Sequence, residues 1–291
     1  MPSLATLGRD LSLFAKYHLK RRVVDYPARE TALGIVPLDL DLREYAARVR
    51  AYAGETFAVR TVAELDYEGE RHPMLEVRFA PEGATRTLLI LAGVHGNEHA
   101  GLLAVPPSWI ASRPSDPPVR CVVVTPANPV GAAHLSRYNA DGYDINRDFV
   151  RFYTPEARAI RDLLAQLSPN FVVSLHEGPQ DASFFFANRL VDRALALELL
   201  ARMEERGVAL ATRDYFGRTL SPPGYAPTGA IAAGLNWLWA RSLGMMASGA
   251  FAEERGVPEI TLESSWRLPD PAERVRAHVE LVLGLAGALA R

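Results

Sequence analysis

Two histidines and a glutamate in this chain have the residue types and the setting of a metal site. Residues 88–99 read LLILAGVHGNEH, so an apolar run that suits a buried strand leads into a glycine-containing turn with His95 and Glu98. A second apolar run, Phe171 to Leu175, ends directly in His176. Two imidazoles and one carboxylate are the ligands of an open catalytic zinc, which keeps one position for water or substrate. H-x-x-E alone is a weak signal, and the second strand ending in a histidine strengthens the prediction of one zinc ion per chain.

A long polar loop after another buried strand contains the second candidate group. It includes N-P-V-G at 128–131 and R-Y-N-A-D-G-Y-D-I-N-R at 137–147. Composition alone would describe an ordinary solvated loop. Arg137 and Arg147, with the adjacent Asn146, could instead hold a carboxylate or an oxyanion, because the arginine fork matches a carboxylate bidentately.

Glu263 is the third candidate, because it ends the short apolar strand predicted from Pro258 to Leu262. A carboxylate in that position is seldom a core residue unless it is paired. Beside a metal it could take a proton from water and pass it to a leaving nitrogen.

The remaining histidines and Glu177 offer no second motif. Glu177 follows His176, but position 180 is Gln, so the H-E-x-x-H pattern is absent. Isolated histidines are usually solvated or hydrogen-bonded, so no role is assigned to His18, His72, His134 or His278.

The elements that must position these residues alternate between strands and helices. Predicted strands cover residues 73–80, 87–94, 119–125, 171–175 and 258–262, and predicted helices cover 98–111, 155–167, 191–206 and 271–290. This alternation predicts an α/β fold with a mixed, largely parallel twisted sheet flanked by helices. Ligand sites in such sheets lie at the carboxyl ends of strands, where the polar clusters fall.

Composition and net charge limit the classes of partner that we expect. The 291 residues carry 34 acidic and 32 basic side chains, a net charge of −2, with 48% hydrophobic residues, which is ordinary for a globular protein. The near-neutral charge argues against nucleic acid or an anionic membrane as the main partner. A single cysteine, Cys121, allows no internal disulfide and suits a reducing compartment.

The N-terminal region is predicted to be a helical extension, residues 1–55, packed on a single catalytic domain, residues 56–291. Leu4, Leu7, Leu11 and Phe14 have helical spacing, without the apolar core and cleavage site of a secretory signal. No apolar run is long enough to span a bilayer. We therefore expect a cytoplasmic protein; the sequence leaves the oligomeric state open.

Together the clusters resemble the zinc carboxypeptidase family, the carboxypeptidase A-like metallopeptidases. The matching segments are H-G-N-E at 95–98, N-P-x-G at 128–131, the run at 137–147, S-L-H at 174–176 and T-L-E at 261–263, in the family's order. The His₂Glu ligand set of that family is well established. The resemblance implies a carboxypeptidase-like fold and a metallocarboxypeptidase activity on peptides.

The resemblance also implies a role for each matching residue. His95, Glu98 and His176 would hold zinc, and Glu263 would be the general base and then the acid. Arg137 would stabilise the oxyanion, and Asn146 and Arg147 would bind the terminal carboxylate of the substrate. Tyr225 resembles the mobile tyrosine that the family places near its substrate.

Two departures from the family pattern are visible. Asp148 replaces the asparagine that often follows the Asn-Arg pair, which puts a negative charge beside the expected carboxylate clamp or orients Arg147. Glu-Gly-Pro follows His176 in place of a serine-rich turn, so a different outer substrate pocket is expected.

Two alternatives remain at this point. A zinc N-acyl-amino-acid deacylase of the succinylglutamate desuccinylase/aspartoacylase type shares a similar H-G-x-E, an Asn-Arg pair and a later His and Glu. Its substrate would be an acyl-amino acid rather than a peptide. A non-catalytic binding module that kept the fold is the minor alternative.

Overall fold

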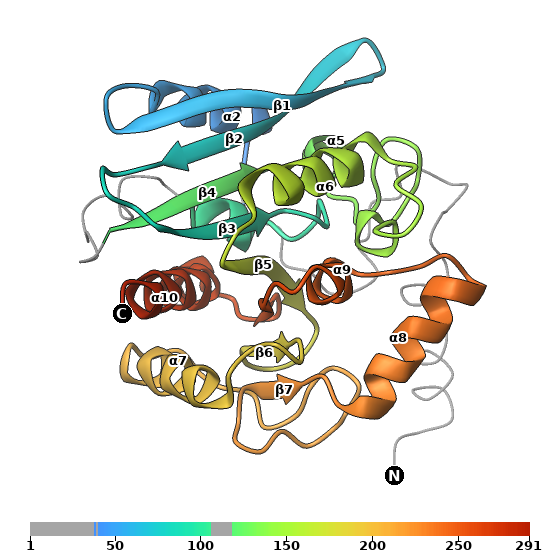
Figure 1. The fold of residues 1–291 in the computed structure, drawn as a ribbon. Coiled ribbons are helices and arrows are strands. Elements are labelled where there is room, and N and C mark those ends of the chain that lie inside the picture. Colours follow the sequence, from blue (N-terminus) through green and yellow to red (C-terminus); the bar gives the residue numbers. More distant parts are fainter. Residues whose placement is uncertain (1–37, 39, 106–117) are drawn as a thin grey trace.

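The computed structural model describes residues 38, 40–105 and 118–291. Within them, one eight-stranded sheet has the order β1-β2-β4-β3-β5-β8-β6-β7 (Figure 1). The central pairs β4·β3, β3·β5 and β5·β8 are parallel, as is β6·β7, whereas β1·β2, β2·β4 and β6·β8 are antiparallel. The strands are β1 (Phe57–Tyr67), β2 (Glu70–Phe79), β3 (Arg86–Ala92), β4 (Val119–Thr125), β5 (Phe171–Gly178), β6 (Phe184–Ala187), β7 (Tyr225–Pro227) and β8 (Glu259–Ser265). The predicted fold class, a mixed and largely parallel sheet flanked by helices, is confirmed.

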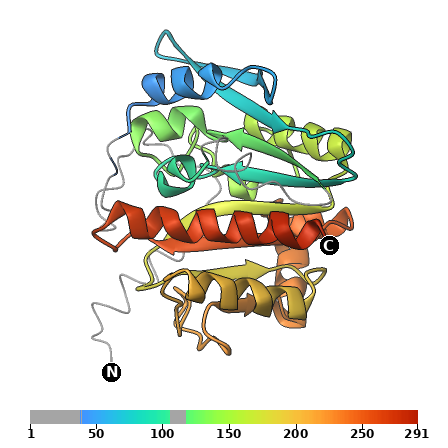
Figure 2. The ribbon, with the colours of Figure 1, turned by 90° about the vertical axis from the view of Figure 1, so that its left-hand side faces the viewer.

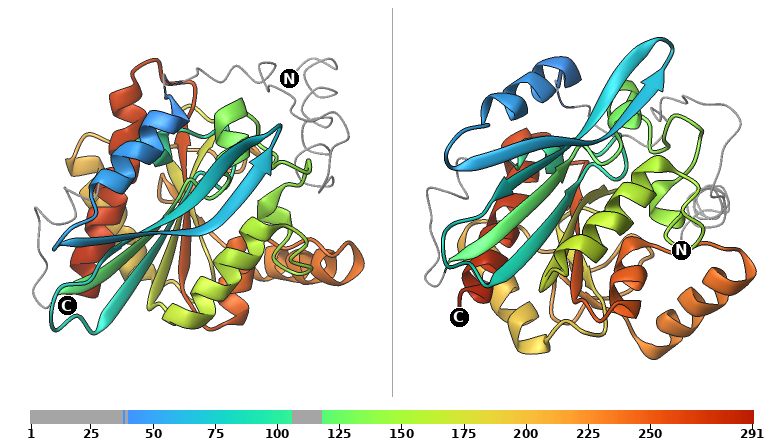
Figure 3. Two further views of the ribbon diagram at one scale, coloured as in Figure 1. Left: turned by 90° about the horizontal axis from the view of Figure 1, so that it is seen from above. Right: turned by 45° about the horizontal axis from the view of Figure 1, so that its top comes forward.

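Helices cover both faces of the sheet (Figures 2 and 3). One face packs against α2 (Leu42–Ala51), α3 (Ala100–Leu103), α7 (Arg193–Glu205) and α10 (Pro271–Leu289), and the other against α6 (Pro155–Leu167) and α9 (Ser248–Glu254). The remaining helical segments are α5 (Pro129–His134), the 3-10 turn η3 (Ile145–Arg147) and α8 (Ala230–Ser242). Because side chains alternate along a strand, each central strand supplies apolar residues to both cores. In β5, for example, Val173 lies in the α10 core and Val172 in the α6 core.

Local signals account for the elements that position the site. Thr154 caps α6 by accepting from the backbone N–H of Ala157, and Pro155 occupies its first turn, as the sequence predicts. Asp270 caps α10 in the same way, accepting from Ala272 N, with Pro271 next.

Some predicted elements differ in length. The helix predicted for 98–111 begins at Ala100, and its described part ends at Leu103; residues 106–117 lie outside the described range. The strand predicted for 171–175 continues to Gly178, which carries His176 inside the strand rather than after it. The helix expected near the N-terminus, residues 1–22, also lies outside the described residues.

Helix α2 belongs to the segment predicted as an extension. Its Tyr45 hydroxyl lies 2.5 Å from Thr125 Oγ1 and donates to Leu102 O at 3.2 Å. These buried contacts fasten α2 to the ends of β4 and α3. Within the described residues, no helix is long and apolar enough to cross a membrane.

Candidate functional site

The three predicted metal ligands converge at the carboxyl end of the parallel strands. Glu98 Oε1 lies 2.8 Å from His95 Nδ1, and Glu98 Oε2 lies 2.8 Å from His176 Nδ1. The two Nδ1 atoms are 3.0 Å apart, and all three side chains are buried. Among the described residues, this is the one cluster of histidines, cysteines and acids with metal-holding geometry.

Each histidine has an oxygen near the far side of its ring, hydrogen-bonded in the case of His176 and at ion-pair distance in the case of His95. His95 Nε2 lies 3.3 Å from Asp144 Oδ1, and His176 Nε2 lies 2.9 Å from Ser174 Oγ. When Nε2 of each ring carries the proton toward these oxygens, both Nδ1 lone pairs point at Glu98. Three acceptors then face one small volume, which is the arrangement a divalent cation satisfies. The residues therefore fit a metal ion.

The charges of the cluster agree with that arrangement. Burial opposes the ionised form of Glu98, but His95 and His176 outweigh it and hold the pKa of Glu98 well below its usual value. Burial lowers the pKa of His176, which favours the neutral imidazole that binds metals. A lowered pKa for both groups favours the carboxylate form of Glu98 and the deprotonated form of His176, which are the forms that bind a metal.

The turn between His95 and Glu98 packs directly on the start of α5. A Cβ at Gly96 would lie 2.0 Å from the carbonyl carbon of Gly131, so backbone meets backbone here. Asn128 N also donates to Gly93 O at 2.9 Å. The H-G-N-E and N-P-V-G segments therefore form one packed unit.

Glu263 faces the cluster from the neighbouring strand. It is the register partner of His176 across the parallel β5·β8 pair, and it is buried. A Cβ on Gly178 would lie 3.2 Å from Glu263 Oε2, so this carboxylate lies close against the β5 backbone. Burial, followed by repulsion from Glu98, raises the pKa of Glu263 well above its usual value.

Arg137 joins the metal cluster to the polar loop. Its Nε and Nη2 contact Asp144 Oδ2 at 2.9 and 2.8 Å, and its Nη1 lies 3.2 Å from His95 Nδ1. Burial raises the pKa of Asp144, but Arg137 and then His95 outweigh it and hold that pKa well below its usual value. The anionic Asp144 fixes the arginine beside the ligands.

Asn146 and Arg147 are held by residues 246–248, at the start of α9 and just before it. Ser248 N donates to Asn146 Oδ1 at 2.9 Å, and Met246 N donates to Arg147 O at 3.2 Å. Arg147 Nη1 donates to its neighbour's carbonyl, Asn146 O, at 2.8 Å. Burial lowers the pKa of Arg147, and Asp144 opposes this.

The buried carboxyl group of Glu259 hydrogen-bonds to residues 246–248 through Ser248. Ser248 Oγ donates to Glu259 Oε1 at 2.7 Å, and burial raises the pKa of Glu259 to about 7. Glu259 lies on the same face of β8 as Glu263, because the two are four residues apart in one strand. It therefore anchors the loop that positions Asn146.

The Asp148 carboxylate is hydrogen-bonded and is not a free charge beside the Asn146–Arg147 pair. Its Oδ2 accepts from Thr154 N at 2.7 Å, and the residue is buried. The carboxylate therefore fixes the turn that leads into α6.

The structure does not bring Tyr225 to the cluster. Its ring packs on Phe185 in the core under α7, and burial, followed by Arg193 and Asp192, is what shifts its pKa. Because β8 contributes Leu262 to that same core, the adjacent Glu263 points to the opposite face. Tyr225 is therefore on the wrong face of the sheet for the predicted role.

Tyr215, unlike Tyr225, lies on the face of the sheet that carries Glu263. Its ring packs edge-on against Phe184 and Phe186, and Phe184 is the β6 register partner of Glu263. Burial raises the pKa of Tyr215 well above its usual value, Glu263 adds to this, and Arg147 and Arg137 oppose it. Its hydroxyl thus lies in the electric field of the site. The turn signal Asp214-Tyr215-Phe216-Gly217 was the one sequence clue to it.

Glu177 has a structural partner rather than a catalytic setting. It points to the face opposite His176, where Arg274 Nε of α10 donates to its Oε1 at 2.8 Å. Ala100 N at the start of α3 donates to Glu177 Oε2 at 2.9 Å. This buried ion pair ties the end of β5 to two helices.

Comparisons with known proteins agree with this picture. The sequence profile of the family described as succinylglutamate desuccinylase/aspartoacylase catalytic domain matches residues 84–178, about a third of the chain. Carboxypeptidase 2 of Trichophyton tonsurans is 27% identical over 161 residues, which cover 50% of this chain and 28% of that protein. The chain thus spans well under half the length of this curated relative.

Solved structures share the fold. A metallo-carboxypeptidase from Burkholderia cenocepacia has a TM-score of 0.56 at 18% identity, over 84% of this chain and 68% of that one. A succinylglutamate desuccinylase/aspartoacylase from Rhodobacter sphaeroides has a TM-score of 0.53 at 18% identity, over 88% and 69%. The resemblance to zinc carboxypeptidase-like proteins, in sequence over part of the chain and in fold over most of it, is confirmed.

Proposed function

We propose that this chain, which resembles the zinc carboxypeptidase-like proteins in fold and motifs, is a zinc-dependent hydrolase. Its substrate would be a peptide, cleaved at the amide bond next to a C-terminal residue that bears a free carboxylate. The observation that carries the proposal is the convergence of His95, Glu98 and His176 beside Glu263, with Arg137 at the same site.

The metal would be held by His95, Glu98 and His176. When bound, zinc supplies a Lewis acid that polarises a carbonyl and makes hydroxide available from water near neutral pH. No thiolate is present among these ligands, which suits zinc over softer metals.

Glu263 would manage the protons of the reaction. A carboxyl group whose pKa is raised by burial is suited to take a proton from water and return it to the leaving nitrogen. Arg137, fixed by Asp144, would donate to the oxyanion that develops on the substrate carbonyl.

The Asn146–Arg147 pair would set the register of the substrate. A planar guanidinium and an amide together can donate to both oxygens of a terminal carboxylate. Because Asn146 Oδ1 already accepts from Ser248 N, its amide nitrogen would be the group that donates to the substrate. Tyr215 would close over the substrate from the Phe184 side.

The N-acyl-amino-acid deacylase is the second candidate. It is favoured by the family profile that matches residues 84–178, the segment that contains all three ligands and both arginines. An acyl-amino acid also presents a free carboxylate next to its amide bond, so the same clamp would serve it. The two candidates differ in the group on the far side of that bond.

The experiment is a metal assay joined to a substrate panel. Purified protein would be assayed for zinc and then given N-blocked dipeptides, the same dipeptides with an amidated C-terminus, and N-succinyl and N-acetyl amino acids. We expect bound zinc and release of the C-terminal residue from free-carboxylate peptides alone, abolished by Glu263→Gln. Cleavage restricted to acyl-amino acids would select the second candidate. A chain that binds no divalent metal after zinc is resupplied would contradict both.

A further inference from the structure

Helix α8 is an apolar helix with no buried side chain among those described. It reads AIAAGLNWLWARS, and it extends to the side of the sheet and its covering helices (Figure 3). Trp237 is 56% exposed and Leu238 is 49% exposed. Arg241 is a neighbour of both on the helix surface, four residues after Trp237 and three after Leu238. A contiguous exposed apolar face of this kind usually marks a contact surface.

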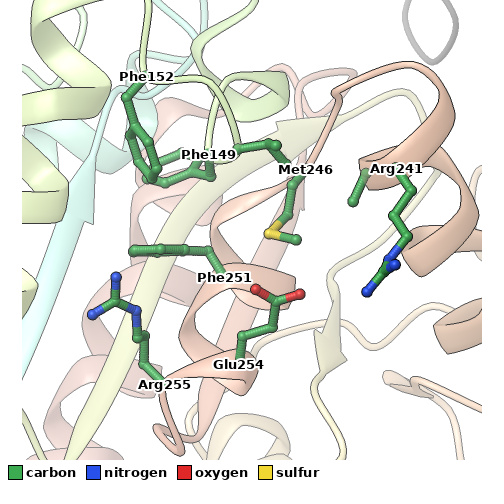
Figure 4. Close-up of a pocket in the computed structure, with 9 residues that line it drawn as sticks. Phe149, Phe152, Arg241, Met246, Phe251, Glu254 and Arg255 are labelled. Atoms are coloured by element: carbon green, nitrogen blue, oxygen red, sulfur yellow. The ribbon is translucent and has the colours of Figure 1, made fainter.

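A hollow of about 290 Å³ opens at the end of that face, between α8, α9 and residues 149–152. Its apolar wall is formed by Phe149, Phe152, Met246 and Phe251 (Figure 4). Arg241 projects from α8 and Glu254 from α9 at its rim (Figure 4). Arg241 also lies over the Trp237 ring, 4.7 Å from its centroid, so the hollow and the exposed tryptophan are neighbours on one surface.

Two other occupants fit this surface less well. Helices that lie on membranes carry a lysine- and arginine-rich polar face, whereas α8 has Arg241 as its one charged residue. Pockets for small molecules usually range from about 300 to 1,000 Å³, so this hollow is at the lower limit and suits one large side chain.

The surface is complementary to itself. It carries a projecting aromatic side chain and, beside it, a hollow that accepts one. Charged side chains also line that hollow, namely the arginines Arg241 and Arg255 and the carboxylate of Glu254. Among the ion pairs of the described residues, none involves Arg241 or Glu254, so both are available to pair across a contact. A two-fold symmetric contact needs each feature and its complement on the same patch, which a foreign partner does not require.

We infer that the α8 surface, made of Trp237, Leu238, Arg241 and the hollow lined by Phe149 and Phe251, joins two copies of this chain. Trp237 of each copy enters the hollow of the other, and Arg241 of each pairs with Glu254 of the other. Tryptophan and arginine in a partly enclosed pocket are typical anchors of such interfaces.

The first test is the oligomeric state of the full chain by sedimentation velocity over a concentration series. We expect a reversible dimer, with a dissociation constant raised at least tenfold by Trp237→Glu. Leu190→Glu is the matched control, because Leu190 is 45% exposed but belongs neither to α8 nor to the lining of the hollow, and it is expected to leave the constant unchanged. A monomer at every concentration, or a dimer that tolerates Trp237→Glu, would overturn the inference. Co-sedimentation of the wild type with phosphatidylcholine vesicles would also overturn it, because it would make a membrane the occupant of the α8 surface.

The second test uses the charges and needs no change in the apolar surface. Arg241→Glu alone creates two Glu–Glu contacts, and Glu254→Arg alone creates two Arg–Arg contacts, so each variant is expected to be monomeric. Mixing the two variants restores opposite charges at both contacts and should yield a heterodimer, as should both changes in one chain. Failure of the mixture to associate would overturn the proposed pairing. Circular dichroism of each variant controls for folding.

Discussion

His176 and Glu263 are register partners on adjacent parallel strands, β5 and β8. Neighbouring strands lie about 4.8 Å apart, so the sheet itself fixes the separation between a metal ligand and the candidate base. Neither residue depends on a loop for its position. This rigidity makes the consequences of single substitutions at the site straightforward to predict.

Glu263→Gln is expected to lower turnover of the substrate about 10²- to 10⁴-fold, because the amide keeps the shape but cannot exchange a proton. Bound metal should be retained, since Glu263 is not one of the three converging ligands. Steady-state kinetics with a parallel metal assay would check this. A variant that loses metal and activity together would place Glu263 among the ligands instead.

His95→Ala is expected to abolish stoichiometric metal binding, because it removes one of three donors. His134→Ala is the control, since His134 packs on Tyr67 and lies outside the cluster. Metal content after dialysis against limiting zinc would separate the two. Equal metal in both variants would rule out the proposed ligand set.

Asp144→Asn is expected to weaken metal affinity about 10- to 100-fold, because Asp144 orients both His95 and Arg137. The measurement is a competition titration with a chromophoric zinc chelator. Wild-type affinity would show that Asp144 does not orient the metal ligand.

Tyr215→Phe is expected to reduce kcat/KM, whereas Tyr225→Phe should leave it unchanged. The reason is their placement: Tyr215 packs on Phe184 beside Glu263, and Tyr225 packs on Phe185 in the opposite core. Kinetics of both variants on one substrate would decide between the residues. The reverse pattern would restore the role predicted for Tyr225 from sequence.

Stability is expected to depend on pH through Glu259. Burial raises the pKa of Glu259 from 4.5 to about 7, so between these values the folded state holds a proton that the unfolded state has lost. The contribution of this group is therefore fully present below about pH 4.5 and is lost as the pH rises through about 7.

Glu259→Gln removes that dependence. The variant should gain stability relative to the wild type between pH 4.5 and pH 8, on the order of 3 kcal/mol. Urea unfolding at both pH values would measure the difference. A constant difference between the two proteins would mean that Glu259 is not buried as described.

The sequence predicted most of the central sheet, because its strands are continuous apolar runs and its helices have strong caps. Strand β4 and helix α6 have the predicted bounds. Strand β1 was missed because it is an edge strand whose residues are mostly half-buried or exposed, so it lacks a clear period. Strands β6 and β7 have four and three residues, too few to show any period.

The three residues of the candidate metal site were predictable because a continuous apolar run leads into each part of the site, residues 88–92 before His95 and Glu98 and residues 171–175 before His176. Tyr215 was not, because its approach to Glu263 arises from tertiary packing. Its loop is held by Asp214, which accepts from the backbone of Phe216 and Arg218, and it folds back onto Phe184. No local spacing distinguishes it from Tyr225.

The contact between Gly96 and Gly131 has a consequence for engineering. A side chain at Gly96 would collide with the backbone of the second segment, so the His95–Glu98 turn cannot be transplanted to another sheet by itself. A transplanted segment 95–98 would therefore need residues 128–131 transplanted with it. For the same reason, an insertion near residues 128–131 can displace His95 and Glu98 although it does not alter those residues. Substitutions in either segment should therefore be tolerated only with matching substitutions in the other.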